Sequence, residues 1–369
     1  INTTSNACTV TLPAGSVGDT IELVDYAGTW DTNYVTLTAD GSEKIKGSTD
    51  DFVLVVERQG VKIVYVDATQ GWVAATGVNE GTAPALTTVY NVEWLIVAGG
   101  GAGGNGNTAS GRAGGGGGAG GYRTGASLSL IGGNEYTVTV GAGGTPVALD
   151  STSSAAGDGG NSILSGTGIT TITSTGGGGG GVREATDQNG NDGGSGGGGA
   201  YSGDGGSATA ITPISGETTT IQGKDGGAGG DKQGSGGGHT AAGTTATGIT
   251  GTDGGAGTAN DIIETGTDVY YAGGGGSGTE TSSATSGGVG GGGDGGHKDV
   301  DNAGDGDANT GGGGGGGGTH EQGGAGGSGI IVLRMLTADY SGSVTGSPTE
   351  STDGSYKVLK FTGDGSYTA

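Results

Sequence analysis

Residues 92–101 read Val-Glu-Trp-Leu-Ile-Val-Ala-Gly-Gly-Gly, so a strongly β-prone run passes directly into glycine. Glycine accounts for 100 of the 369 residues, and it dominates the chain from 99 to 329. The uninterrupted runs cover 114–118, 176–181, 196–199, 273–276, 290–293 and 311–318. Glycine has no side chain to bury and loses the most backbone freedom on folding. A conventional helical or α/β core is therefore excluded for this region.

Short β-like pieces interrupt the glycine runs, at 135–140, 162–164, 170–174, 210–214, 261–264 and 269–271. A disordered linker would not return repeatedly to apolar, β-branched segments, whereas an ordered bundle needs anchors at intervals. We therefore expect packed, extended glycine helices of the polyglycine II type, capped by short strands. At about 3.1 Å per residue, a run of roughly 8–10 residues would give a rod of about 25–30 Å.

The segments that flank the glycine-rich region have ordinary β character. Residues 1–80 alternate short apolar pieces with turn residues such as Ala14-Gly15, which predicts a small all-β module. Its expected strands centre on 8–12, 21–23, 35–37, 53–55, 63–65 and 72–74. Two more strands are expected at 330–335 and 356–361. The predicted organisation is thus an all-β chain with a β module at 1–80, a polyglycine II domain at 81–336 and terminal β strands at 337–369.

Charge and cysteine content restrict the partners. The formal net charge is −24, with 13 Lys and Arg against 37 Asp and Glu, so a basic surface for nucleic acid is disfavoured. Cys8 is the single cysteine, which rules out a disulfide within one chain. No stretch approaches the roughly 18 consecutive apolar residues of a membrane-spanning helix.

Several glycine-containing motifs occur in a characteristic order. They begin with 92–101, continue through Gly114–Gly121 with Tyr122-Arg123-Thr124-Gly125, then 136–144 and 160–164, and end with Gly326-Gly327-Ser328-Gly329 leading into Ile330–Arg334. In this order they resemble the glycine-rich domain of bacteriophage tail-fibre and virion structural proteins, of the type abundant in marine phages. The style is similar to the tail-tip adhesins of T-even phages, whose glycine-rich part is a polyglycine II sandwich. The resemblance covers about 86–335.

The resemblance implies that loops between glycine segments contact a host. The corresponding loops in this chain are 183–193, 201–220, 231–252, 255–271, 280–287 and 297–310. It also implies a position on the virion surface, outside the cell, contacts with other virion proteins and self-association as a homotrimer. Residues 1–75 look like the small β modules of phage fibres. Residues 343–369 resemble strands that usually precede such a domain, which leaves open a further module beyond 369 or a terminal strand that completes this one.

The sequence offers no convincing catalytic or nucleotide-binding motif. The spacing of Gly99, Gly101 and Gly104 imitates a dinucleotide fingerprint, but the residues that follow cannot form the helix that would hold the pyrophosphate. Acidic residues lie in polar, glycine-rich stretches where nothing would shift their pKa values towards catalytic use. We therefore expect no enzyme activity and no resident cofactor.

Two sets of polar residues are weighed as binding sites. Asp299, Asp301, Asp305 and Asp307 supply oxygen ligands that suit Ca²⁺, although the alternative is a solvated recognition loop, and the spacing matches no known calcium motif. His239, His297 and His320 lack the spacing of metal ligands. The candidates for receptor contact are Tyr201, His239, Tyr270, Tyr271 and His297. Tyr201, Tyr270, Tyr271 and Tyr340 would instead pack over the flat flanks of glycine helices if they face inwards.

These observations predict a non-catalytic fibre segment that presents variable loops to a host surface receptor, either a glycan or an outer-membrane protein. One alternative is a capsid or tail decoration protein with a structural role only. Another is a non-viral extracellular protein of the ice-binding or matrix type, which regular threonine spacing on one face would favour; the sequence shows no such regularity.

Overall fold

A computed structural model describes residues 1–78, 87–106, 112–149, 155–182, 188–230, 232–247, 250–298 and 302–369. Apart from one 3-10 turn, η1, the regular elements in these ranges are β-strands, and none of them is a helix long and apolar enough to cross a membrane. The elements are β1 (Cys8–Thr11), β2 (Thr20–Val24), β3 (Val35–Thr38), β4 (Phe52–Leu54), β5 (Gly60–Asp67), β6 (Gly71–Val78), β7 (Thr87–Val97), β8 (Tyr122–Ile131), β9 (Glu135–Thr139), β10 (Ser162–Gly166), β11 (Ile172–Ser174), β12 (Thr258–Asn260), β13 (Val269–Tyr271), β14 (Ile330–Leu336), η1 (Thr337–Asp339), β15 (Ser343–Thr345), β16 (Thr349–Asp353), β17 (Tyr356–Phe361) and β18 (Gly365–Thr368).

The chain is therefore all-β, as the sequence predicts. The six strands expected in the first 80 residues all form, and so do those at 330–335 and 356–361. Two expected strands are wrong: residues 210–214 and 261–264 are irregular. Pro213 lies in the first segment and cannot donate to a β ladder. In the second, Asn260 and Asp261 accept hydrogen bonds from the amides of Ile262 and Gly266, at 2.9 and 3.0 Å, which bends the chain into turns.

The N-terminal strands form a module with its own core. β2, β5 and β6 make a three-stranded antiparallel sheet, and β1, β3 and β4 lie at one end of an eight-stranded sheet. The shared apolar cluster includes the fully buried Trp30 and Trp72. The larger sheet continues out of the module because β4 pairs with the first residues of β7, Phe52 with Thr88 and Val53 with Thr87.

The last part of β7, residues 94–97, is continuously apolar because both of its faces are covered there. Trp94 and Ile96 point into a cluster between the two main sheets, whereas Leu95 and Val97 belong to a second cluster on the opposite face. Side chains alternate across a strand, so only a strand buried on both sides reads as a continuous apolar run. β14 pairs with β7 and is buried in the same way.

The C-terminal strands complete the two main sheets. In the eight-stranded sheet the order is β1-β3-β4-β7-β14-β17-β16, with β8 also paired to β7. The five-stranded sheet has the order β11-β10-β9-β18-β15. Residues 343–369 thus pair directly with strands of the glycine-rich region, β17 with β14 and β18 with β9.

The glycine runs continue from the ends of these strands as extended segments joined by backbone hydrogen bonds. The run from 98 to 106 is representative. Its amides donate to three neighbouring segments, and amides three residues apart donate to the same segment. The pairs, donor first, are Gly99–Gly160 and Ala102–Gly157, Gly100–Gly327 and Gly103–Gly324, and Gly101–Gly118 and Gly104–Gly115. Its carbonyls accept from three further segments, through the amides of Gly144, Gly177, Gly180, Gly314 and Gly317. Buried backbone groups are thus satisfied between segments.

Close backbone approach explains the glycine. A Cβ added at Gly117 would lie 2.8 Å from the carbonyl carbon of Gly101 and still closer to its oxygen. The same holds through most of the runs, where the nearest atoms are neighbouring backbone atoms. The expected bundle of packed helices is nevertheless not supported as such, because the described residues of the runs are assigned to no helix.

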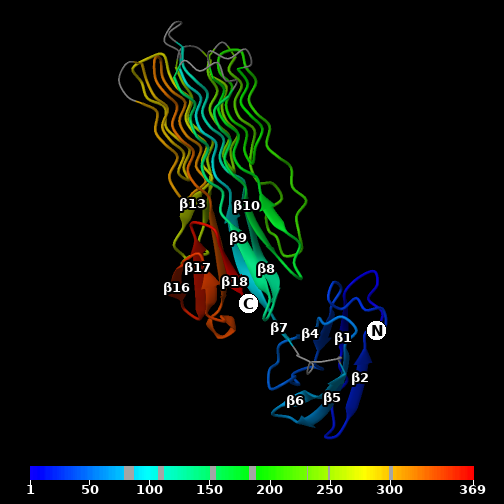
Figure 1. The fold of residues 1–369 in the computed structure, drawn as a ribbon. Coiled ribbons are helices and arrows are strands. Elements are labelled where there is room, and N and C mark those ends of the chain that lie inside the picture. Colours follow the sequence, from blue (N-terminus) through cyan, green and yellow to red (C-terminus); the bar gives the residue numbers. More distant parts are fainter. Residues whose placement is uncertain are drawn as a thin grey trace.

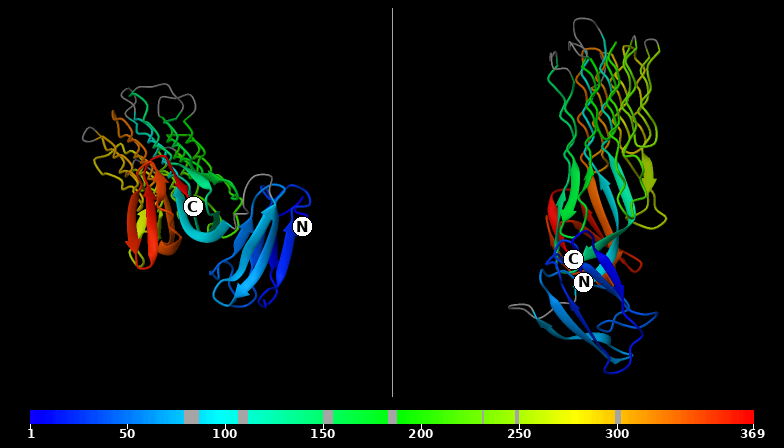
Figure 2. Two further views of the ribbon diagram at one scale, coloured as in Figure 1. Left: turned by 60° about the horizontal axis from the view of Figure 1, so that its bottom comes forward. Right: turned by 90° about the vertical axis from the view of Figure 1, so that its right-hand side faces the viewer.

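We call the stacked glycine segments the glycine slab. They lie side by side along one direction and extend away from the main sheets (Figures 1 and 2). The N-terminal module lies at the opposite end of the molecule (Figure 1). The slab therefore has a proximal end at the sheets and a distal edge where the chain reverses direction.

Candidate functional site

The distal edge is built from tight turns between glycine segments. Gly203, Lys232 and Glu321 each donate their amide to the carbonyl three residues earlier, at 2.8, 2.7 and 3.1 Å. We define the distal edge by the described residues at 105–106, 112, 147–148, 200–204, 229–230, 232–233, 279–285, 297–298 and 318–322 (Figure 1). Their side chains are held by the slab, since each turn begins and ends in a hydrogen-bonded segment.

Polar side chains link neighbouring turns across this edge. The Arg112 guanidinium carbon lies 3.9 Å from the centre of the Tyr201 ring. Lys232 Nζ and Glu280 Oε2 form an ion pair at 2.8 Å. Asn105 Nδ2 donates to the carbonyls of Val147 and Ala148, at 3.0 and 2.6 Å. The described residues of the edge therefore form a charged surface whose turns are linked by side chains.

The five receptor-contact candidates do not gather at one place. Tyr201 and His297 lie at the distal edge, where His297 is bridged to the backbone of Thr279. Tyr270, His239 and Tyr271 lie at the proximal end: Tyr270 and Tyr271 belong to β13, and the amide of His239 donates to Ala272 at 2.9 Å. Tyr270 is 46% exposed. The candidate loops are likewise divided, with 280–287 distal and 255–271 proximal.

Tyr271 is buried and the ring nitrogens of His239 are shielded from solvent, and receptor contact by these two residues stays a prediction. Tyr271 is 1% exposed, and burial raises its pKa to about 12. The His239 ring is tilted against Tyr122, with centroids 4.6 Å apart, and neither ring nitrogen has a hydrogen-bond partner among the described residues. Burial lowers the pKa of His239 below its ordinary value, partly offset by the nearby carbonyl of Ile221. Both residues stabilise the attachment of the slab to β8 and β13.

The acidic cluster considered for calcium is only partly described. Asp299 and Asp301 lie outside the described residues. Asp305 Oδ1 accepts the amide of Ala325 at 2.7 Å, and the carbonyl of Asp307 accepts the Thr310 hydroxyl. Within the described ranges, no three His, Cys, Asp or Glu residues are placed to hold one metal ion.

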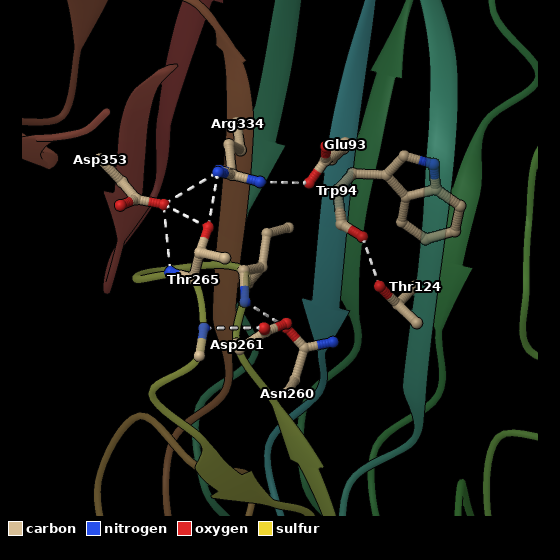
Figure 3. Close-up of polar contacts among 10 residues, drawn as sticks. Glu93, Trp94, Thr124, Asn260, Asp261, Thr265, Arg334 and Asp353 are labelled. Atoms are coloured by element: carbon tan, nitrogen blue, oxygen red, sulfur yellow. Dashed lines mark hydrogen bonds and ion pairs between the residues drawn. The ribbon is translucent and has the colours of Figure 1, made fainter. Parts of the chain in front are cut away.

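An extended polar network lies at the proximal end (Figure 3). Arg334 of β14 donates to Glu93 Oε2 of β7 at 2.9 Å and to Asp353 Oδ2 of β16 at 2.8 Å. Thr265 donates both its amide and its hydroxyl to the same Asp353 oxygen, at 3.1 and 2.6 Å. These bonds from Thr265, together with Arg334, lower the pKa of Asp353. The network thereby fastens the loop between β12 and β13 to the main sheet.

The network offers little for catalysis. A depression of 190 Å³ beside it is lined by Glu93, Asn260, Asp261 and Ile262, among others. Arg334 pairs with both carboxylates, and the bonds from Thr265 and Arg334 lower the pKa of Asp353, away from that of a general acid. We interpret this constellation as structural.

A buried ion pair joins the irregular segment 211–219 to β8. Arg123 donates to both oxygens of Glu217, at 2.8 and 2.7 Å, and the two side chains are 7% and 0% exposed. Burial alone would raise the pKa of Glu217, but the hydrogen bond from Arg123 and further donors lower it below its ordinary value. Glu217 also accepts the amide of Ile214 at 2.9 Å, which shapes the turn.

Comparison with known proteins gives one assignment. No curated protein matches the chain. A family model described as a glycine-rich domain matches residues 75–336. This span includes every glycine run, the strands from β7 to β14 and the whole distal edge. Over this span, which is most of its length, the chain belongs to the glycine-rich domain family.

Proposed function

We propose that this chain is a non-catalytic segment of a bacteriophage tail fibre or a related virion fibre, and that its distal edge attaches to a host cell surface. The observation that carries this proposal is that backbone hydrogen bonds between glycine segments hold the slab together. Stability comes from backbone bonds between glycine segments, so the turns at the distal edge need no apolar core beneath them. Such a scaffold can hold polar, variable loops in fixed positions.

The hydrogen-bond geometry favours polyglycine II for the runs. In that conformation three residues make one turn, so successive amides point about 120° apart. The run from 98 to 106 donates to three neighbours with a three-residue repeat and accepts from three others, as this packing requires. The tail-tip adhesins to which the motifs are similar use the same packing, and this agreement supports the fibre assignment.

The N-terminal module is the end that we assign to assembly with other virion proteins. Val17, Val24 and Tyr26 are 78%, 59% and 79% exposed and lie in or next to β2, an edge strand of its sheet. Exposed apolar side chains beside an edge strand favour contact with another protein. In a homotrimer, equivalent modules would meet at this end and leave three distal edges free.

A blocking experiment tests which end attaches. The single cysteine allows Cys8→Ser to be combined with Ser283→Cys at the distal edge or Asp268→Cys in the proximal loop. Each variant is coupled to a bulky polyethylene-glycol maleimide, and binding of the fluorescently labelled protein to candidate host cells is measured by flow cytometry. We expect the Ser283→Cys conjugate to lose binding and the Asp268→Cys conjugate to keep it.

Attachment through the distal edge would be contradicted if both conjugates lost cell binding equally. It would also be contradicted if neither conjugate lost cell binding. If the unmodified chain binds no host cell and electron microscopy places it within the virion wall, the purely structural role becomes the correct one.

A further inference from the structure

We infer that the distal edge holds a binding site for an acidic sugar, centred on Arg112 and Glu280. This inference rests on the proposed function, because it names the class of host ligand that the distal edge would contact. It starts from the arginines: of those that the structure describes, Arg58, Arg123 and Arg334 each pair with a carboxylate, and Arg112 does not. A guanidinium without a carboxylate is notable in a chain with a net charge of −24.

The surroundings of Arg112 prepare it for an anionic group. Tyr201 supports one face of the guanidinium at 3.9 Å, which fixes its plane. Nη1 is shielded from solvent and has no partner among the described residues. A planar guanidinium with donors to spare matches the two oxygens of a carboxylate or phosphate.

Glu280 adds an acceptor close by. Lys232 neutralises one carboxylate oxygen at 2.8 Å, and the other oxygen, Oε1, is shielded and has no donor in the described part of the chain. Backbone bonds place these groups together. Gly278 donates to Gly114 and Gly116 donates to Gly234, so the segment that begins at Arg112 runs between those that carry Glu280 and Lys232.

The combination selects one class of ligand. An unpaired guanidinium donates hydrogen bonds to a carboxylate or phosphate, and a carboxylate oxygen without a donor accepts hydrogen bonds from hydroxyl groups. A sugar with one acidic substituent supplies both. A highly charged polymer such as nucleic acid is disfavoured, because the chain's net negative charge would repel it.

Matched sugars test the site without using cells. Galacturonic acid and galactose differ at the carboxylate, and glucose 6-phosphate and glucose differ at the phosphate. Their binding to the full chain is measured by saturation-transfer NMR titration. We expect each acidic sugar to bind at least about tenfold more tightly than its neutral counterpart, with an advantage that falls as salt is raised.

Variants then locate the site. Arg112→Gln is expected to remove the preference for the acidic sugars, while Arg112→Lys keeps part of it, since the charge remains but the planar fork is lost. Arg58→Gln, which changes an exposed arginine of the N-terminal module, is the matched control and should bind like the unmodified chain. Thermal unfolding of each variant checks that the slab is intact.

Three outcomes would overturn the inference: no binding of either acidic sugar, equal binding of acidic and neutral sugars, or an unchanged preference in Arg112→Gln. None of them affects attachment through the distal edge, which the conjugates on Ser283→Cys and Asp268→Cys test separately. Loss of cell binding in the distal conjugate together with no sugar binding would retain the proposed function and reject this ligand class.

Discussion

Replacing Gly117 by alanine tests whether close backbone contact holds the slab together. Gly117 lies in a central segment: its amide donates to Gly314 at 2.8 Å and its carbonyl accepts from Gly275 at 2.9 Å. The new Cβ would lie 2.8 Å from the carbonyl carbon of Gly101, whereas carbon atoms in ordinary contact are about 3.5–4.0 Å apart. One segment must therefore move by about 1 Å.

The expected cost follows from that movement. A shift of about 1 Å stretches both hydrogen bonds of Gly117 beyond the range in which they contribute. Each buried polar group left without a partner costs about 1–3 kcal/mol, so Gly117→Ala should destabilise the domain by about 2–6 kcal/mol. For a domain of this size, that loss lowers Tm by roughly 5–20 °C. Differential scanning calorimetry measures it.

The matched control is Gly363→Ala. A Cβ at Gly363 would meet no atom within 4 Å, and its φ does not fall in the left-handed range. We expect its Tm to stay within about 2 °C of the unmodified chain. If Gly117→Ala has the same Tm as Gly363→Ala, the slab tolerates side chains between its segments and the backbone-packing argument fails.

Three further predictions concern buried or linked polar groups. Glu217→Gln leaves Arg123 buried without its ion pair and should cost about 3–5 kcal/mol in urea unfolding, whereas the double change Arg123→Met and Glu217→Met should recover most of that loss. His239→Phe should reduce the acid sensitivity of Tm. Because the folded pKa of His239 is lowered, the unfolded chain binds the extra proton below its ordinary value of about 6.5, so stability falls as pH decreases from there towards the folded pKa; equal pH profiles for both proteins would contradict this. Asp353→Asn should weaken the bonds to Thr265 and Arg334 and speed amide hydrogen exchange at 262–268, while Asp268→Asn, an exposed change in the same loop, should not.

Strands were predicted best from the sequence where burial on both faces requires a continuous run of apolar residues. Residues 94–97 and 330–333 are apolar without interruption because β7 and β14 are covered on both faces there, and both strands were expected. The failures at 210–214 and 261–264 have the opposite cause. There, apolar residues are present, but Glu217, Asn260 and Asp261 bond to local backbone amides and turn the chain away from any partner strand.

The order of the glycine segments could not be predicted. Gly114–Gly118 and Gly311–Gly318 present identical backbone surfaces, so nothing in their composition says which segment lies beside which. The same limit applies to the polar sites. Arg334 and Glu93 are 241 residues apart, and Arg112 and Tyr201 meet only because their segments are neighbours in the slab. Pairs of this kind carry no periodic signal in a single sequence.

Because the glycine segments are uniform, side chains at the two ends of the slab must fix the register in which the segments pair. A slab bonded through identical backbones has no preferred register, and a slip by one three-residue turn would restore most of its hydrogen bonds. Side chains at the proximal end remove that freedom: Ser162 donates its hydroxyl to Val97 at 2.8 Å and Ser174 bonds Gly121, where strands pass into glycine. Asn105 performs the same task at the distal edge through Val147 and Ala148. Because register is fixed at these points, substitutions at other distal side chains, Arg112 and Glu280 among them, are expected to leave the fold unchanged.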